Sequence, residues 1–243
     1  MAERNLVYLV ISGSRMYGTY NKDSDYDYRG IFVPDSDYVV GMHKCDQVIF
    51  EKHHPNFSGK VLDYTIYSLP KFFKLAIDNN PNIVELLFAP EESIKGRSEI
   101  SSIIINNRDL FISQKSYYTF TGYAYSQKHK IINKGKDNVS GKRKFLYDKY
   151  GWDTKSGSHL IRVLIQIKQL LIMGKIMFPL EESPLLLDIR DGKYTQKEVL
   201  EMSDTMLSDV DKYFDKTILP YSADIKSLNE LQQEILFDYW KKT

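Results

Sequence analysis

The sequence predicts an α/β protein of the α+β kind, with a small mixed sheet and flanking helices followed by a helical C-terminal region. Up to about residue 69, the apolar residues form short runs rich in Tyr, Val and Ile, which is typical of strands. Beyond that point they recur at helical spacing, most regularly between residues 156 and 173. We therefore expect a domain over residues 1–110 that carries the sheet, and a helical region over residues 111–243.

Three segments are expected to form the strands that position a site. Residues 6–11 are predicted to be a buried strand that runs into the turn Ser12-Gly13-Ser14. A second strand begins near Asp25 and continues through residues 29–33 into the core, and residues 60–67 supply a third. A strand, a glycine turn, a short connection and an acidic strand together form an arrangement that is typical of functional sites.

The helices are predicted from periodicity and from stop signals. Between residues 156 and 173 one apolar stripe is followed by Gly174, a typical helix end; the stripe consists of Leu160, Val163, Leu164, Ile167, Leu170 and Leu171. The other helices are expected over residues 82–88, 97–106, 113–132, 195–214 and 227–241.

Composition excludes several classes of protein. The formal net charge of +1 argues neither for nor against a nucleic-acid partner, and the single cysteine, Cys45, excludes an intramolecular disulfide and a multi-cysteine zinc site. The sequence lacks the phosphate loop of ATPases, the dinucleotide-binding glycine motif and the zinc-protease motif. No stretch approaches the roughly 20 apolar residues that cross a bilayer, and the first apolar run is predicted to be a strand rather than a signal peptide. We therefore expect a cytoplasmic protein that does not engage a membrane.

Two acidic residues mark the start of the second strand. Alternate side chains of a strand share one face, so Asp25 and Asp27 point one way while Tyr26 and Tyr28 point the other. Two carboxylates this close favour a bound cation, and oxygen ligands suit Mg2+ or Mn2+ rather than zinc. The alternative is a solvated turn, since residues 21–24 are turn formers.

The spacing of these motifs resembles a known family. Gly13-Ser14, a gap of ten residues and then Asp25-Tyr26-Asp27-Tyr28 is similar to the signature of the DNA polymerase beta-type nucleotidyltransferase superfamily. The chain more closely resembles the RNA-ligase-associated branch of predicted nucleotidyltransferases in bacteria and phages, which carries pairs such as Tyr17-Gly18 and Arg29-Gly30. Further segments extend the similarity over about residues 5–192; they are Tyr67-Ser68-Leu69 to Asn80-Pro81-Asn82, Glu85-Leu86-Leu87-Phe88 and Ser158-His159-Leu160-Ile161-Arg162.

The resemblance implies a metal-dependent nucleotidyltransferase that moves a nucleoside monophosphate from an NTP to an acceptor hydroxyl. Two Mg2+ (or Mn2+) ions need more than two acids, and Asp63, in the strand of residues 60–67, is the candidate third carboxylate. Asp25, Asp27 and Asp63 are therefore expected to be the catalytic and metal-binding residues. The alternative for Asp63 is an acid on an edge strand in water.

The glycine turn is expected to bind the triphosphate. Glycine lets the backbone approach a ligand closely, so N–H groups of Gly13 and Ser14, with the Ser14 hydroxyl, are expected to contact the β and γ phosphates. Arg15 either touches the same phosphates or is exposed.

A second nucleotide-binding group is expected near the start of the longest helix. Ser156, His159 and Arg162 share one helix face, and with Lys155 they are expected to form an anion site at a helix N-terminus. The alternative is that Asp153 or Thr154 caps the helix and that His159 is an ordinary neighbour.

Positive charge is concentrated in one stretch. Between Lys128 and Lys144 there are seven Lys or Arg residues and one acid, Asp137. Such a stretch suits a polyanionic acceptor, although an ordinary solvated loop is equally consistent with it. The leading acceptor is an RNA end, in RNA repair or modification. The alternatives are a protein hydroxyl, as in nucleotidylating toxins and antitoxins, and a nucleotide- or RNA-binding module without catalysis.

Overall fold

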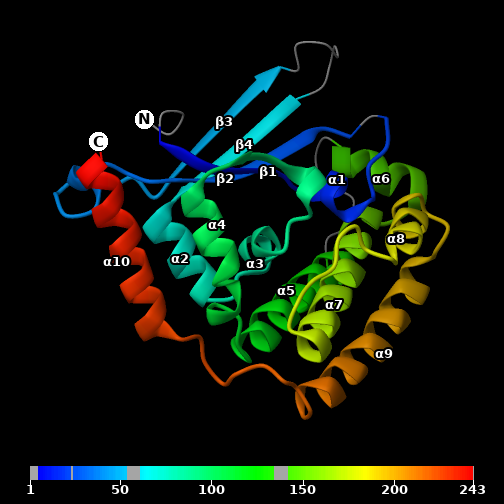
Figure 1. The fold of residues 1–243 in the computed structure, drawn as a ribbon. Helices are drawn as coiled ribbons and strands as arrows, with labels where there is room; N and C mark the ends of the chain where they lie inside the picture. Colours follow the sequence, from blue (N-terminus) through cyan, green and yellow to red (C-terminus); the bar gives the residue numbers. More distant parts are fainter. Residues whose placement is uncertain (1–4, 23, 54–60, 134–141, 243) are drawn as a thin grey trace. The chain divides into compact units, whose positions relative to one another are not determined.

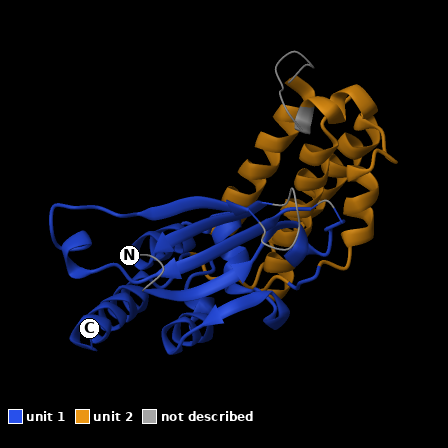
Figure 2. Ribbon diagram, turned by 90° about the horizontal axis from the view of Figure 1, so that it is seen from above, with its two compact units in different colours: residues 1–113, 177–179, 222–243 blue, residues 114–176, 180–221 orange. Residues whose placement is uncertain are grey.

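The computed structural model describes residues 5–22, 24–53, 61–133 and 142–242. The chain divides into two compact units: unit 1 contains residues 1–113, 177–179 and 222–243, and unit 2 contains residues 114–176 and 180–221 (Figure 2). The predicted fold class, a small mixed sheet with flanking helices and a helical C-terminal region, is confirmed. The domain boundary at residue 110 stays a prediction, and residues 222–243, which it placed in the helical region, belong to unit 1.

Over the described residues, unit 1 is built on a five-stranded mixed sheet (Figure 1). Its strands are β1 (Leu6–Ile11), β2 (Tyr26–Phe32), β3 (Gln47–His53), β4 (Val61–Ser68) and β5 (Ile94–Arg97), in the order β3-β4-β2-β1-β5. The β2–β4 pair is parallel, and the other neighbouring pairs are antiparallel. The parallel pair is what sets the second and third predicted strands side by side.

Helices of unit 1 pack on one side of the sheet (Figure 1). The phenol of Tyr8 on β1 donates a hydrogen bond to the carbonyl of Leu86, at 3.2 Å, and Phe73 meets Phe111 edge to face with ring centroids 5.0 Å apart. The first contact joins the sheet to α3, and the second lies within the helical layer. The elements of this layer are α2 (Leu69–Ile77), α3 (Pro81–Leu87), α4 (Glu99–Asn106) and α10 (Ile225–Lys242), with 3-10 turns η1 (Ser36–Tyr38), η2 (Glu91–Ser93) and η3 (Arg108–Leu110).

Side-chain caps fix where α2 and α3 begin. The Ser68 hydroxyl accepts a hydrogen bond from the N–H of Lys71 at 3.4 Å, and the Asn80 side chain accepts one from the N–H of Asn82 at 3.0 Å. Each helix also carries a proline in its first turn, where the missing N–H would have no helical partner. The start of α3 after Asn80 thus follows directly from local sequence.

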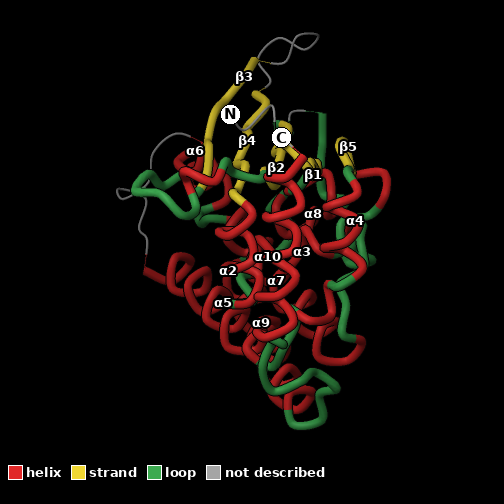
Figure 3. The backbone as a smooth tube through the Cα atoms, turned by 60° about the vertical axis from the view of Figure 1, so that its left-hand side comes forward, coloured by secondary structure: helices red, strands yellow, loops and turns green. Residues whose placement is uncertain are grey.

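The regular elements in the described part of unit 2 are all helices, joined by loops (Figure 3). It contains α5 (Lys115–Asn133), α6 (Lys142–Tyr150), α7 (Thr154–Met173), α8 (Ser183–Arg190) and α9 (Gln196–Phe214). The predicted apolar stripe of α7 is buried, and α7 packs against α5, α8 and α9. Gly174 ends the helix at a φ of 68°, with its N–H donating to the carbonyl of Leu170.

The sequence patterns did not reveal β3, β5, α6 and α8, and residues 13–17, where a turn was expected, form the helix α1. A helix was also expected from residue 97, whereas residues 94–97 form β5 and α4 begins at Glu99, after the capping residue Ser98. Within the described part of the chain, no helix combines the length and the apolar character needed to cross a membrane.

Candidate active site

The predicted acids lie along neighbouring strands. In the parallel β2–β4 pair, Asp27 lies opposite Asp63, and residues paired in this way project to the same face of a sheet. Asp25 directly precedes β2, and its Oδ1 accepts a hydrogen bond from the N–H of Val61, the first residue of β4, at 3.4 Å. The backbone register therefore brings residues from two distant parts of the sequence into one acidic row.

The acidic row continues onto β3, where Glu51 is paired with Asp63. Neighbouring strands lie about 4.8 Å apart, so like charges directly opposite one another are unfavourable unless a cation lies between them. Among the described residues, no three acidic, histidine or cysteine side chains converge closely enough to hold a metal ion as they stand. Metal binding by Asp25, Asp27 and Asp63 stays a prediction.

The glycine turn lies against the carboxylate of Asp27. A β-carbon at Gly13 would be 2.3 Å from Oδ2 of Asp27, and Gly13 has a φ of +64°. The N–H of Ser12 donates to the backbone carbonyl of Asp27 at 2.8 Å. Helix α1 (Gly13–Tyr17) follows, and it ends at Gly18, whose φ of 79° is left-handed. The loop expected to hold phosphate thus directly adjoins an acid expected to hold metal.

The opposite face of these strands carries stacked aromatic rings. Tyr28 stacks on Tyr64 with ring centroids 4.7 Å apart, and Tyr64 stacks on Phe50 at 4.6 Å. Burial raises the pKa of Tyr28 above its ordinary value, so the phenol stays neutral at physiological pH. Aromatic pairs across strands stabilise strand pairing. The rings therefore help to hold β2, β4 and β3 in the register that aligns the acids.

Arg15 is engaged with the loop before β2. Its guanidinium carbon lies 3.6 Å from the centroid of the Tyr26 ring and 5.1 Å from that of Tyr20, and its Nη2 donates to the carbonyl of Ser24 at 3.2 Å. Tyr26 alternates with Asp27 along β2 and so belongs to the other face. These contacts give Arg15 a structural role, and its role toward phosphates stays a prediction.

The start of α7, in unit 2, is capped by Asp153. Its Oδ1 accepts from the N–H of Ser156 at 3.0 Å and its Oδ2 accepts from the Ser156 hydroxyl at 2.8 Å, with both residues buried. The structure therefore shows the capping arrangement at this helix N-terminus, where an acid complements the helix dipole.

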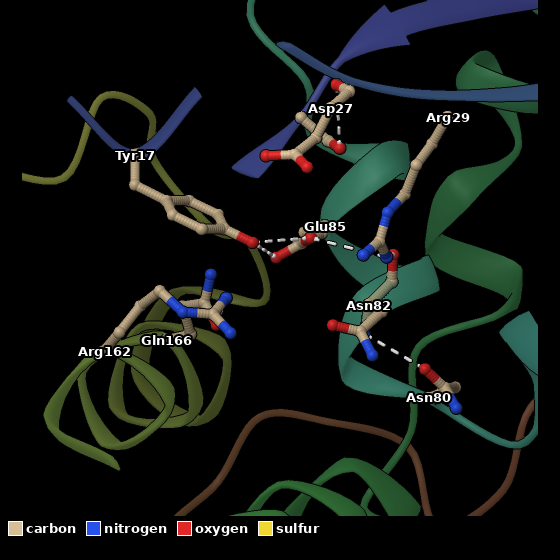
Figure 4. Close-up of polar contacts among 9 residues, drawn as sticks. Tyr17, Asp27, Arg29, Asn80, Asn82, Glu85, Arg162 and Gln166 are labelled. Carbon is tan, nitrogen blue, oxygen red and sulfur yellow. Dashed lines mark hydrogen bonds and ion pairs between the residues drawn. The ribbon is translucent and has the colours of Figure 1, made fainter. Parts of the chain in front are cut away.

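The other residues of the second predicted nucleotide-binding group differ in exposure. Lys155 is exposed and His159 is half-buried. Arg162 is 4% exposed, and its Nη1 donates to Oε1 of Gln166 at 3.2 Å (Figure 4). An anion site that combines these side chains with Ser156 stays a prediction.

Residues 134–141 of the basic stretch predicted to contact RNA lie outside the described residues. In its described part, Lys128 forms an ion pair with Asp204 on α9, and Lys144 is exposed on α6. Contact with RNA through this stretch stays a prediction.

A buried polar cluster adjoins the glycine turn, and the sequence analysis assigned it no role. Glu85 on α3 is fully buried, and both of its carboxylate oxygens lie 2.8 Å from the hydroxyl of Tyr17, the last residue of α1 (Figure 4). Nη1 of Arg29 on β2 lies 4.0 Å from Oε1 of Glu85 and donates to the carbonyl of Asn82 at 3.1 Å. The only signal in the sequence was that Tyr17, Arg29 and Glu85 lie in segments that carry the family resemblance.

A family model described as RlaP, RNA repair pathway DNA polymerase beta family, matches residues 2–231 of the chain. The chain belongs to this family. The predicted membership of the polymerase beta-type nucleotidyltransferase superfamily is thereby confirmed.

Two curated relatives of this family member share part of its sequence. It is 35% identical over 132 residues to an Enterobacteria phage T4 protein described as an uncharacterized 38.9 kDa protein in the nrdC-mobD intergenic region, covering 51% of this chain and 38% of that protein. It is 37% identical over 82 residues to the uncharacterized protein YcgL of Bacillus subtilis (strain 168), covering 34% and 30% respectively. The matches thus span well under half of the length of either relative.

Among solved structures, a nucleotidyltransferase-like protein from Exiguobacterium sibiricum 255-15 is similar at 12% identity, over 99% of this chain and 87% of that chain. Its TM-score is 0.33, which is too low to support a conclusion about function.

Proposed function

We propose that this protein is a metal-dependent nucleotidyltransferase that moves a nucleoside monophosphate from an NTP to a hydroxyl at an RNA end, in RNA repair or modification. The proposal is carried by the acidic row in which Asp27 lies opposite Asp63, with Gly13 in contact with Asp27. Membership of the polymerase beta family supports the same class of reaction.

The chemistry of the acidic row suits Mg2+ or Mn2+. Asp25, Asp27 and Asp63 offer only oxygen ligands, which hard divalent cations prefer. The glycine at position 13 keeps open the space beside Oδ2 of Asp27 that any β-carbon would fill. When bound, the metal ions supply positive charge that offsets the charge of the phosphates and lowers the pKa of the acceptor hydroxyl.

In this proposal the chain itself positions the nucleotide and accepts a proton. Backbone N–H groups of Gly13 and Ser14, with the Ser14 hydroxyl, hold the β and γ phosphates. Asp63 lies on the acceptor side and accepts the proton of the attacking hydroxyl. The bond from that oxygen to the α phosphorus forms while the bond to the bridging oxygen breaks, and pyrophosphate leaves. In unit 2, Lys155, Ser156, His159 and Arg162 are proposed to form an anion site.

RNA is proposed as the acceptor for two reasons. The family description names an RNA repair pathway, and Lys and Arg are concentrated in residues 128–144. A basic stretch attracts a polyanion and raises its local concentration. A protein hydroxyl is the competing acceptor, and the experiment below distinguishes the two.

Transfer of labelled nucleotide tests this proposal. The protein is incubated with Mg2+ and each α-labelled NTP, together with either RNA oligonucleotides with free hydroxyl ends or a protein extract. We expect label on RNA, which is lost with EDTA and restored by added Mg2+. Asp27→Asn and Asp63→Asn should each lower the rate by about 10²-fold or more, because an amide cannot balance a divalent charge.

The matched control is Asp37→Asn, which neutralises an exposed acid in η1 and should keep the wild-type rate. Label that appears only on protein removes RNA as the acceptor. Transfer that survives both Asp27→Asn and Asp63→Asn rejects the site. Nucleotide binding without transfer to either acceptor leaves a binding module in place of an enzyme.

A further inference from the structure

Glu85 is a charged residue in the apolar interior of unit 1. The other buried residues of α3 are all apolar: Pro81, Ile83, Val84, Leu86 and Leu87. Burying a carboxylate in such surroundings costs free energy unless it is hydrogen-bonded and paired. Two of the residues that contact Glu85, Tyr17 and Arg29, belong to two elements of the proposed active site. The cluster thus connects α3 to the glycine helix α1 and to the acidic strand β2.

Helix α1 depends on outside contacts for its position. It has five residues, whereas an isolated helix needs roughly 12 or more to be stable in water. Its first residue, Gly13, lies against Asp27, and its last, Tyr17, is held by Glu85. The Tyr17 ring also packs near Phe178, with ring centroids 6.0 Å apart. A displacement of Tyr17 therefore moves the Gly13 turn relative to Asp27.

Arg29 ties the same carboxylate to the acidic strand. It lies two residues after Asp27 on β2 and so projects to the same face. Its Nη1 contacts Glu85 and the carbonyl of Asn82, so it is held to α3 at two points one helical turn apart. The carboxylate of Glu85 thus contacts both α1, which begins with the Gly13 turn, and β2, which carries Asp27.

We propose that Tyr17, Glu85 and Arg29 form a positioning cluster that sets the spacing between the Gly13 turn and Asp27, and that this spacing makes the site favour a nucleoside triphosphate over a monophosphate. The inference rests on the proposed function, because the β and γ phosphates are the groups that the turn is proposed to hold. A monophosphate lacks both groups. Loss of the cluster therefore weakens binding of the triphosphate and leaves binding of the monophosphate unchanged.

Tyr17→Phe, with Tyr8→Phe as a matched control, tests the cluster. Each substitution removes one buried phenol that donates to α3, but Tyr8 lies on β1 and donates to the carbonyl of Leu86, while Tyr17 lies on α1. Calorimetric titration measures the Kd of each NTP with Mg2+ and of the matching NMP. In Tyr17→Phe we expect the Kd of the NTP to rise about tenfold, the factor that ~1.4 kcal/mol represents, with the Kd of the NMP unchanged. In Tyr8→Phe both values should stay at the wild-type level.

A double variant tests whether Tyr17 acts through Glu85. Glu85→Leu suits the apolar surroundings, and when it is combined with Tyr17→Phe the Kd of the NTP should be no higher than in the worse single variant, because both changes break one link. Equal shifts in the Kd of the NTP and of the NMP overturn the proposal, since they indicate general destabilisation. The proposal is also overturned if Tyr17→Phe and Tyr8→Phe have the same Kd for the NTP.

Amide hydrogen exchange separates a failure of the cluster from a failure of the proposed function. In the absence of nucleotide, residues 13–18 should exchange faster in Tyr17→Phe than in Tyr8→Phe, because α1 has lost its anchor. If the wild-type protein binds no NTP, the proposed function and the selectivity are rejected, and the exchange result still decides whether the cluster holds α1. Equal exchange in the two variants rejects the positioning role itself.

Discussion

At Gly13 the backbone approaches the carboxylate of Asp27 more closely than a residue with a β-carbon would allow. Its φ of +64° is accessible to glycine at little cost, and the absence of a β-carbon lets the turn lie in contact with the Asp27 carboxylate. The same residue therefore meets a conformational demand and a spatial one. Substitution tests both demands at once.

Gly13→Ala should lower both stability and activity. The left-handed conformation costs a non-glycine residue about 1–2 kcal/mol, and the new methyl group would displace the Asp27 carboxylate, from which it would be 2.3 Å distant. We expect a lower free energy of unfolding by urea and a transfer rate lower by about 10²-fold, since small misplacements of a reacting group are costly.

Gly122→Ala is the control for this substitution. Gly122 lies within α5, and a β-carbon there would meet nothing within 4 Å. Alanine should raise the free energy of unfolding by roughly 0.5–1 kcal/mol and leave transfer unchanged. A Gly13→Ala variant that transfers nucleotide at the wild-type rate would show that the contact with Asp27 has no role in the reaction.

The three acids of the candidate site were predicted in two different ways. Alternation along a strand placed Asp25 and Asp27 on one face. Asp63 was the candidate for the third acid that the family resemblance implies, and the structure pairs it with Asp27. Glu51 was missed because β3 lies at the sheet edge and its exposed residues hide the strand pattern. Glu85 was given no role because its partner Tyr17 is 68 positions away, and no local rule connects residues so distant.

Tyr117 supplies one of the contacts between α5 and α9 in unit 2. Tyr117 on α5 donates its phenol proton to Oδ1 of Asp211 on α9 at 2.7 Å, and its ring stacks on Phe214 with centroids 4.1 Å apart. The hydrogen bond to Asp211 raises the pKa of Tyr117 from 10.0 to about 12, with a smaller contribution from burial. The contact thus holds the two helices together only while the phenol keeps its proton.

The stability of unit 2 should fall in alkaline solution for this reason. Because the pKa of Tyr117 is higher in the folded state, its contribution is complete below pH 10 and is lost as pH rises through about 12. Over this pH range, the free energy of unfolding by urea should decline more in the wild type than in Tyr117→Phe. Asp211→Asn, which removes the charge responsible, should behave like Tyr117→Phe. A wild-type decline no steeper than that of either variant would contradict this assignment.

Elements with strong local signals were predicted well, and others were not. The helix expected over residues 195–214 corresponds to α9, where Thr195 and Glu198 form a reciprocal cap. Residues 156–173 correspond to α7, which ends at Gly174. β5 has only four residues and alternates between half-buried and exposed positions, so that its strand character comes from pairing with β1. Tertiary pairing of this kind cannot be inferred from a short stretch of sequence.

At the scale of the whole molecule, unit 1 is assembled from separate parts of the chain. Helix α10 packs against α2, and it buries Leu228, Ile235 and Leu236. Nε1–H of Trp240 donates to the carbonyl of Pro34, just beyond β2, at 2.9 Å. Unit 1 therefore includes contacts between residues separated by 206 positions.

Leu228→Ala should destabilise unit 1 selectively. The side chain is fully buried, and truncating it leaves a cavity that lowers the free energy of unfolding by about 2–5 kcal/mol. Native-state hydrogen exchange should show lower protection in the strands of unit 1 and unchanged protection in α7 and α9. Phe237→Ala on the same helix removes a ring that is 53% exposed and should have a much smaller effect. Equal losses in both units, or equal effects of the two variants, would contradict the assignment of α10 to unit 1.

The order of synthesis gives this arrangement a further consequence. A ribosome makes all of residues 114–176 and 180–221 before it makes α10, so the helices of unit 2 emerge while α2 still lacks its cover. Local helical contacts form faster than pairings across the full chain. A nascent chain paused near residue 221 would thus carry a complete set of strands and a folded helical unit 2, but its unit 1 would still lack α10. The apolar surface of α2 that α10 covers would be exposed to chaperones.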